Sequence, residues 1–246
     1  MTKQGEIDYF KNIGMEGIRH SLSKPFSDAY CGRYLMELGA VMLLLPPPPA
    51  KLLDLGCGTG GTSSFFSRRG YDVTGQDISE IAIDHANNKQ QIEKLDHLRF
   101  VVGDYEDMHF DNEFDCVVFF DSLHHSGNEQ DAIKMSYKAL KFGGVCITSE
   151  PGIRHAESKM TIEAVKRHHV TERNMPPKRI IKAAKKAGFK AFEIYPHASS
   201  SAIVYGGESS EGVMAHVLKF KPLRTIAAIF GIMFYKRFSG IVLMIK

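Results

Sequence analysis

The chain has 246 residues, of which 43% are hydrophobic and 24% charged; this composition indicates a folded globular protein and excludes disordered, collagen-like and fibrous chains. The formal net charge of +3 is unevenly distributed, because residues 1–150 carry about −8 and residues 151–246 about +11. A chain of this length buries enough surface to need no disulfide for stability, and its four cysteines show no paired spacing. We therefore expect reduced thiols and a cytoplasmic protein.

The first 50 residues are expected to form a helical extension. Residues 1–12 mix charges of both signs without an apolar core, so no secretory signal is predicted. Four consecutive prolines at residues 46–49 cannot continue a helix and favour a stiff extended segment. We expect residues 1–50 to pack as an extension or lid over one edge or the ligand face of the following domain.

From residue 51 onward, short β-rich runs alternate with helical stretches, which indicates βαβ units around a mostly parallel sheet. The expected strands are residues 51–55, 71–76, 98–102, 114–120, 145–149, 191–195 and 241–245. The expected helices are residues 63–69, 80–94, 131–141, 160–169 and 177–187. We expect residues 51–246 to form a Rossmann-like α/β domain with a doubly wound, seven-stranded, mostly parallel sheet and an antiparallel last strand.

Residues 198–240 separate the last two expected strands and are interpreted as an insertion with its own helix around residues 223–235. Only 11 uncharged residues lie between Arg224 and Lys236, short of the roughly 18 needed to span a bilayer. A helix that is apolar all round is usually buried, here against the sheet or in a dimer contact. Because basic residues flank it, peripheral membrane contact through residues 222–236 is the alternative. A monomer and a homodimer both remain open.

A glycine-rich turn follows the first expected strand in the run LDLGCGTG, residues 53–60. Gly56, Gly58 and Gly61 also fit the dinucleotide pattern G-x-G-x-x-G, and Asp77 lies where that pattern places a ribose-binding acid. Asp54 argues against a dinucleotide, because a carboxylate beside the turn would repel a pyrophosphate. It suits a cationic ligand such as S-adenosylmethionine, which carries an ammonium and a sulfonium. Alternatively, Asp54 only accepts hydrogen bonds from loop N–H groups.

The LDLGCGTG run resembles the signature loop of class I S-adenosylmethionine-dependent methyltransferases of the type 11/25-like small-molecule group. Later segments at residues 73–79, 103–106, 114–125 and 140–145 resemble the same family in the same order. The resemblance covers residues 51–150 well and the remainder in outline. It implies S-adenosyl-L-methionine as cofactor, with the binding residues Asp54, Gly56, Cys57, Gly58, Thr59, Gly60, Asp77, Ile78, Asp104, Tyr105, Glu106, Phe120 and Asp121. Within this set, the resemblance implies that Asp77 holds the ribose hydroxyls and Asp104 the adenine amino group.

Candidate catalytic residues lie where the fourth and fifth strands end. His124 and His125 leave the fourth strand at the ligand edge, and Glu150 ends the fifth. If the acceptor is a hydroxyl, a base that takes its proton assists methyl transfer, and histidine is the usual choice near neutral pH. The hypothesis is that His125 is the base with Glu150 as its partner, and that His124 is the alternate.

Other candidate residues fall in the region expected to form the acceptor pocket: His155, His168, His169 and Glu172. Exposure at a helix end explains these residues equally well. No metal is predicted, because neighbouring histidines cannot share one helix face and no H-E-x-x-H set occurs.

The acceptor is expected to be small or linked to a carrier. The chain lacks the N-P-P and D-P-P segments of enzymes that methylate nucleic-acid amines, so no nucleic acid is predicted as a partner. We expect methyl transfer to an oxygen or nitrogen atom, with saccharides among the candidate acceptors. The alternatives are an NAD-dependent oxidoreductase and a protein that binds S-adenosylmethionine without turnover.

Overall fold

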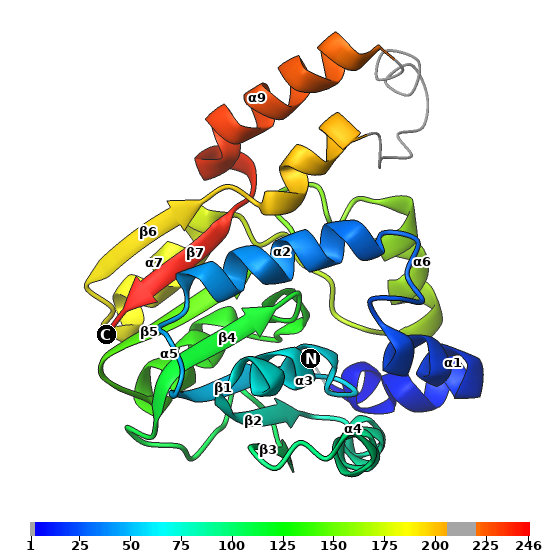
Figure 1. The fold of residues 1–246 in the computed structure, drawn as a ribbon, viewed down its shortest axis with the longest axis vertical. Coiled ribbons are helices and arrows are strands. Elements are labelled where there is room, and N and C mark those ends of the chain that lie inside the picture. The colour runs from blue at the N-terminus through cyan, green and yellow to red at the C-terminus, as the bar shows by residue number, and fades with distance from the viewer. Residues whose placement is uncertain (1–2, 206–219) are drawn as a thin grey trace.

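The computed structural model describes residues 3–205 and 220–246, which form a twisted central sheet with helices on both faces (Figure 1). The strands are β1 (Lys51–Leu55), β2 (Asp72–Asp77), β3 (Leu98–Val102), β4 (Phe114–Phe120), β5 (Leu140–Ser149), β6 (Ala191–Tyr195) and β7 (Ile241–Ile245). Their order in the sheet is β3-β2-β1-β4-β5-β7-β6. The first five strands pair in parallel, whereas β7 runs antiparallel to β5 and β6. The expected Rossmann-like fold with seven strands and an antiparallel last strand is therefore confirmed.

The helices are α1 (Gln4–Ser23), α2 (Cys31–Leu44), α3 (Gly61–Arg69), α4 (Glu80–Glu93), α5 (Glu129–Ala139), α6 (Lys159–His168), α7 (Pro177–Ala187) and α9 (Lys221–Phe238). Short 3-10 turns form η1 (Leu123–His125) and η2 (Ala198–Tyr205). Ser79 caps the start of α4, because its hydroxyl accepts the Ala82 N–H, and Gly188 caps the end of α7 in the left-handed conformation.

The core has one apolar layer on each face of the sheet, because successive side chains of a buried strand point to opposite faces. In β1, Leu53 and Leu55 pack with Ile133 of α5 and Ile180 of α7. On the other face, Leu52 packs in a cluster that includes residues of α2 and α3. Because helices cover both faces of the sheet, a ligand is expected to bind beyond the carboxyl ends of its parallel strands.

The two N-terminal helices occupy different places. Helix α2 packs on one face of the sheet, where Leu38 and Val41 are buried. Helix α1 lies beyond the strand ends and contacts α3, α4 and α6 (Figure 1). Its course is broken at Gly14, whose φ of 65° and ψ of −174° suit glycine almost alone.

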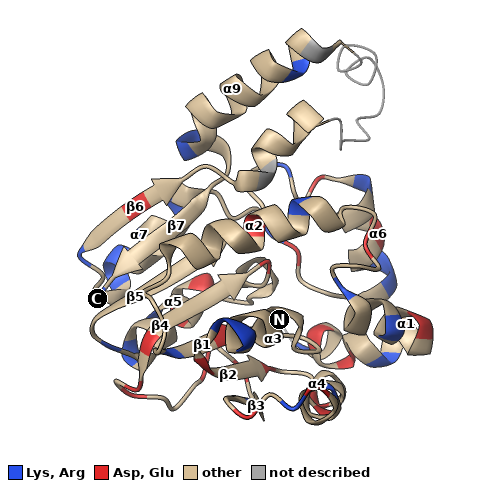
Figure 2. Ribbon diagram, viewed as in Figure 1, with Lys and Arg blue, Asp and Glu red and all other residues tan. Residues whose placement is uncertain are grey.

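Helix α9 projects from the body of the molecule and packs mainly against η2 (Figure 1). In Figure 2, basic residues lie near its two ends and no acidic residue lies along it. Its apolar side chains are largely exposed, among them Ile226, Phe230 and Met233. The sequence predicted burial of this helix against the sheet or in a dimer contact, and within this chain the sheet does not bury it. No helix within the two described ranges has the length and hydropathy of a membrane span.

The junction between the fifth helix and the fifth strand differs from expectation. The sequence predicted a helix to residue 141, a glycine turn and a strand from residue 145. Instead α5 ends at Ala139 and β5 begins at Leu140, which pairs with Phe114 before the register shifts. Gly143 takes a φ of 78° within this irregular stretch, so the two glycines serve a bend inside the strand rather than a turn before it.

Candidate active site

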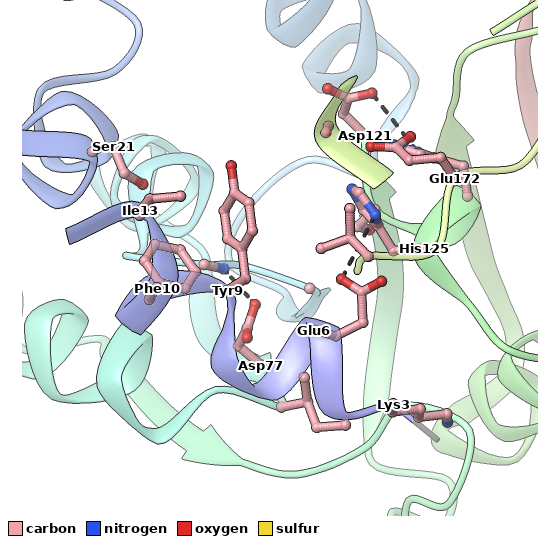
Figure 3. Close-up of a pocket in the computed structure, with 18 of the residues that line it drawn as sticks. Lys3, Glu6, Tyr9, Phe10, Ile13, Ser21, Asp77, Asp121, His125 and Glu172 are labelled. Atoms are coloured by element: carbon pink, nitrogen blue, oxygen red, sulfur yellow. Dashed lines mark hydrogen bonds and ion pairs between the residues drawn. The ribbon is translucent and has the colours of Figure 1, made fainter. Parts of the chain in front are cut away.

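A cavity of about 510 Å³ lies beyond the carboxyl ends of β1 to β4, under helix α1. Its walls come from the loops after these strands, from α1, from α6 and from His155, Val170 and Glu172. Figure 3 shows Asp77 and Phe10 on one side of the cavity and His125, Asp121 and Glu172 on the other. Ten predicted site residues line it: Gly56, Gly58, Asp77, Ile78, Asp104, Tyr105, Glu106, Asp121, His124 and His125.

The glycine turn brings bare backbone to this cavity. Gly56 has a φ of 72°, which favours glycine, and its N–H donates to the Gln76 carbonyl oxygen at 2.8 Å. A Cβ at Gly56 would come within 2.6 Å of the Cβ of Ser122, closer than real carbon atoms approach. The close approach of two loops therefore requires glycine here independently of any ligand.

Asp54 lies behind the turn and does not line the cavity. Its side chain is fully buried, and the hydroxyls of Thr62 and Ser63 donate to Oδ2 at 2.7 and 2.6 Å. Oδ1 accepts no hydrogen bond from the described part of the chain. Burial raises the pKa of Asp54 to about 6. The partners are hydroxyls of α3 rather than the loop N–H groups considered from the sequence.

Asp77 ends β2 at the cavity wall. Its carboxylate accepts the N–H groups of Gly58 at 2.8 Å and Ser79 at 3.0 Å. Burial raises its pKa, although these two hydrogen bonds act in the opposite direction. Each carboxylate oxygen has a second lone pair, so the side chain can still accept hydroxyl groups of a ligand. Ile78 lies beside it on the same wall.

The segment after β3 is tied to the N-terminus of α1. Lys3 forms ion pairs with Asp104 and with Glu106, the latter at 2.9 Å. Glu106 also accepts the Gly127 N–H at 2.6 Å, and the Tyr105 hydroxyl donates to the Ser122 carbonyl at 3.1 Å. Sequence reasoning missed Lys3, because the resemblance does not extend to residues 1–50.

Four other predicted cofactor residues do not line the cavity: Cys57, Thr59, Gly60 and Phe120. The Thr59 hydroxyl lies 3.0 Å from that of Ser21 and so joins the glycine turn to α1. Phe120 is buried, with its ring centroid 5.1 Å from that of Tyr34.

Glu150 organises the turn that carries the histidines. Its carboxylate accepts the N–H groups of Ser122 at 3.0 Å and Leu123 at 2.8 Å, and it lies 2.7 Å from Nδ1 of His124. Burial disfavours the charged imidazole, but the hydrogen bond and charge of Glu150 outweigh it and raise the pKa of His124 to about 9.

The expected pairing of Glu150 with His125 is wrong. His125 Nδ1 instead donates to the Thr171 carbonyl oxygen at 2.8 Å. Burial and the neighbouring His124 charge lower the pKa of His125 to about 4. The two rings lie close together, with centroids 4.0 Å apart, but the Glu150 carboxylate accepts the Leu123 N–H and lies against Nδ1 of His124, whereas Nδ1 of His125 meets the Thr171 carbonyl.

Residues distant in sequence complete this wall. Glu172 Oε2 lies 2.6 Å from Nε2 of His155 and 3.5 Å from Nε2 of His124. Glu6 of α1 accepts the Thr171 N–H at 2.5 Å, and burial raises the pKa of Glu6 to about 7. Of the four further candidates from the sequence, His155 and Glu172 line the cavity, whereas His168 and His169 do not. Glu6 carried no sequence signal beyond its place in the expected lid.

The strand order, the point between β1 and β4 where the order of strand addition reverses, and the glycine turn define a Rossmann-like ligand-binding domain. Residues 53–148 match the family model described as a methyltransferase domain. This part of the chain, which holds the glycine turn and Asp77, is therefore similar to the methyltransferase domains of that family.

Two curated relatives match the same region. A sarcosine/dimethylglycine N-methyltransferase of Aphanothece halophytica is 32% identical over 108 residues, 43% of this chain and 39% of that protein. A sterol 24-C-methyltransferase of Gibberella zeae is 36% identical over 101 residues, 40% of this chain and 27% of that protein. The aligned region thus spans well under half of either relative.

Solved structures share the fold over the whole chain. Phosphoethanolamine N-methyltransferase 2 of Haemonchus contortus, in complex with phosphomonomethylethanolamine and S-adenosylhomocysteine, gives a TM-score of 0.67 at 19% identity, covering 100% of this chain and 60% of that one. Geranyl diphosphate C-methyltransferase of Streptomyces coelicolor gives a TM-score of 0.64 at 16% identity, covering 100% and 98%. These relatives differ in acceptor.

Proposed function

We propose that the protein is an S-adenosylmethionine-dependent methyltransferase acting on an oxygen or nitrogen atom of a small or carrier-linked acceptor, with saccharides among the candidates. One observation supports this most directly: the glycine turn and Asp77 form one side of a cavity whose other side carries the histidine turn. A donor held at the first side therefore faces ionisable groups at the second.

The side chains at the proposed cofactor side fit this donor. Asp77, Asp104 and Asp121 line the cavity, and Asp54 lies buried behind it with one oxygen that has no hydrogen-bond partner among the described residues. This concentration of carboxylates favours a cationic ligand and disfavours a pyrophosphate. When bound, S-adenosylmethionine supplies a methyl group made electrophilic by its sulfonium. Asp77 would hold the ribose hydroxyls and Tyr105 would cover the adenine ring.

Residues at the acceptor side would align the nucleophile, exclude water and manage a proton. In this proposal Nε2 of His125 takes the proton from an acceptor hydroxyl, while its Nδ1 stays on the Thr171 carbonyl. Glu150 and His124 act as positioning residues, because Glu150 fixes both the turn and the His124 ring. Helix α1 covers the cavity, which supports the role of a lid for residues 1–50.

Binding and turnover experiments separate the alternatives. Calorimetry should show binding of S-adenosylmethionine and S-adenosylhomocysteine but not of NAD. The reverse result would support the alternative hypothesis, an NAD-dependent oxidoreductase. Asp77→Ala should weaken S-adenosylmethionine binding at least about tenfold, whereas Asp72→Ala at the exposed start of β2 serves as the matched control. Methyl-transfer assays on an acceptor panel, with His125→Ala and Glu150→Ala, test turnover. Tight cofactor binding without any transfer would favour the non-catalytic alternative.

We also propose that α9 makes peripheral contact with an anionic membrane surface. The side chains of Ile226, Phe230 and Met233 are 61%, 59% and 68% exposed, and Arg224 and Lys236 flank them without any acid on the helix. Apolar burial and attraction to anionic lipid would then act together. A second copy of the chain covering α9 is the competing outcome, and the four free thiols fit the proposed cytoplasmic location.

Flotation with vesicles of phosphatidylcholine and phosphatidylserine tests this contact. The intact protein should float, and a variant lacking residues 222–236 or carrying Ile226→Ser, Phe230→Ser and Met233→Ser should not. Phe142→Ser is the control, because Phe142 is 89% exposed on β5 away from this helix. Equal flotation of all variants, or a concentration-dependent dimer lost with the α9 substitutions, would overturn the membrane proposal.

A further inference from the structure

Three potential metal ligands meet at the acceptor side of the cavity although two segments distant in sequence supply them. His124 and His125 come from η1, and Glu172 comes from the segment between α6 and α7. One ligand atom from each lies within 4.8 Å of the other two. A sequence search for compact ligand motifs cannot find such a set, because some 46 residues separate the histidines from Glu172.

The hydrogen bonds around the two imidazoles are those of metal-binding histidines. Nδ1 of His124 lies 2.7 Å from the buried Glu150 carboxylate, and Nδ1 of His125 lies 2.8 Å from the Thr171 carbonyl oxygen. Histidine ligands usually donate one ring N–H to a carboxylate or backbone carbonyl, which fixes the tautomer and directs the other nitrogen to the ion. With Nδ1 of each ring engaged in this way, Nε2 is the nitrogen available to an ion, and His124 would release its second proton when the ion binds.

The carboxylate lies at a suitable distance. Glu172 Oε2 is 3.5 Å from Nε2 of His124, a separation that two ligands of one ion can have when each lies about 2.0–2.2 Å from it. Nε2 of His155 lies 2.6 Å from the same carboxylate oxygen and positions the Glu172 side chain, although His155 is not one of the three candidate ligands. The side chains of His124 and Glu172 are only 4% and 11% exposed, so bulk water competes weakly for the ligand atoms.

We propose that His124, His125 and Glu172 bind a divalent transition-metal ion, with an open coordination position facing the cavity. Two imidazoles and one carboxylate favour zinc or ferrous iron over magnesium or calcium, which prefer oxygen ligands alone. All three residues line the cavity where the acceptor would lie. An acceptor oxygen bound at the open position would lose its proton more readily. This role rests on the proposed function, whereas ion binding itself does not.

His125 has a different role when an ion is bound. With Nε2 bound to an ion, His125 cannot take the acceptor's proton; the ion instead lowers the pKa of the bound hydroxyl, so that its proton passes to solvent water before methyl transfer. Without an ion, the same three groups form only an ion-pair cluster around Glu172. The two states therefore predict opposite effects of added metal on methyl transfer.

The test uses the full chain, dialysed against chelator and then against chelator-free buffer. Calorimetry with Zn²⁺ and visible spectroscopy with Co²⁺, both without S-adenosylmethionine, should show one bound ion per chain. His125→Gln and Glu172→Gln should each weaken Zn²⁺ binding at least about tenfold. His20→Gln should not, because His20 lines the same cavity outside the cluster. Retained S-adenosylmethionine affinity and an unchanged circular dichroism spectrum show that a variant is folded.

Two results would overturn the site: no ion bound by the unaltered protein, or equal binding by all variants. Full methyl transfer in chelator-treated protein that Zn²⁺ inhibits would overturn only the ion's role in activating the acceptor. Each of these leaves the proposed methyltransferase function intact. Conversely, one-to-one ion binding that depends on Glu172, in a protein that ignores S-adenosylmethionine, would support the site and refute the function.

Discussion

Replacing the buried Asp54 carboxylate with an amide should stabilise the protein, and increasingly so as the pH rises. Burial raises the pKa of Asp54 from 3.8 to about 6. At about 1.4 kcal/mol for each pKa unit, the ionised carboxylate lowers the free energy of unfolding by about 3 kcal/mol. Because the folded-state pKa is above the unfolded one, this loss is absent below about pH 3.8 and complete above about pH 6.

The Asp54→Asn variant removes this titration but keeps a carbonyl oxygen to accept the Thr62 and Ser63 hydroxyls. The difference in unfolding free energy between Asp54→Asn and the unaltered protein should grow by about 2 kcal/mol in favour of the variant between about pH 4.5 and pH 7.5. Urea denaturation followed by circular dichroism, without cofactor, measures it at both pH values.

Asp72→Asn provides the control, since Asp72 is exposed at the start of the neighbouring strand. If the Asp54→Asn difference changed with pH no more than the Asp72→Asn difference, the Asp54 carboxylate would not be desolvated in solution. That result would refute the burial of an ionised Asp54 carboxylate beside the glycine turn.

Three other substitutions test separate features. Gly56→Ala should lower the free energy of unfolding by about 2–4 kcal/mol, because alanine is strained at this positive φ and its Cβ would collide with Ser122. An unchanged melting temperature in thermal unfolding would contradict the described contact. Glu150→Gln should lower the free energy of unfolding by about 1–3 kcal/mol and release the His124 ring, because an amide N–H₂ group would face the N–H groups that the carboxylate now accepts. Imidazole NMR signals identical to those of the unaltered protein would refute this. Gly14→Ala should strain the break in α1 by about 1–3 kcal/mol and weaken S-adenosylmethionine binding, and equal affinity would show that this break does not shape the cavity.

Local sequence signals predicted the sheet well because they are repeated in each unit. The expected strands at residues 51–55, 98–102 and 114–120 coincide with β1, β3 and β4. Each of these strands combines a buried apolar run with a turn that follows it, so the hydrophobic pattern and the turn residues indicate the same strand boundaries. The α5–β5 junction was mispredicted, because its two glycines satisfy a turn and a bent strand equally well.

The cavity was predictable only on the side built by the strand ends. Asp77 lies in the cavity wall, as its position at the end of the second expected strand indicated, because parallel strands end at the same edge of a sheet. Glu6 and Glu172 join the site through packing of α1 and of the segment after α6, which no local pattern specifies. The choice of His124 over His125 as the partner of Glu150 depends on ring directions within a single turn.

The place of β7 in the sheet has a consequence for synthesis of the chain. Strand β6 is translated first, yet it pairs with β7, which follows after 45 residues and also covers the edge of β5. Until residues 241–245 leave the ribosome, two strands expose unpaired backbone groups that can join strands of other molecules. Chaperone capture of nascent chains should therefore be strongest in this late interval.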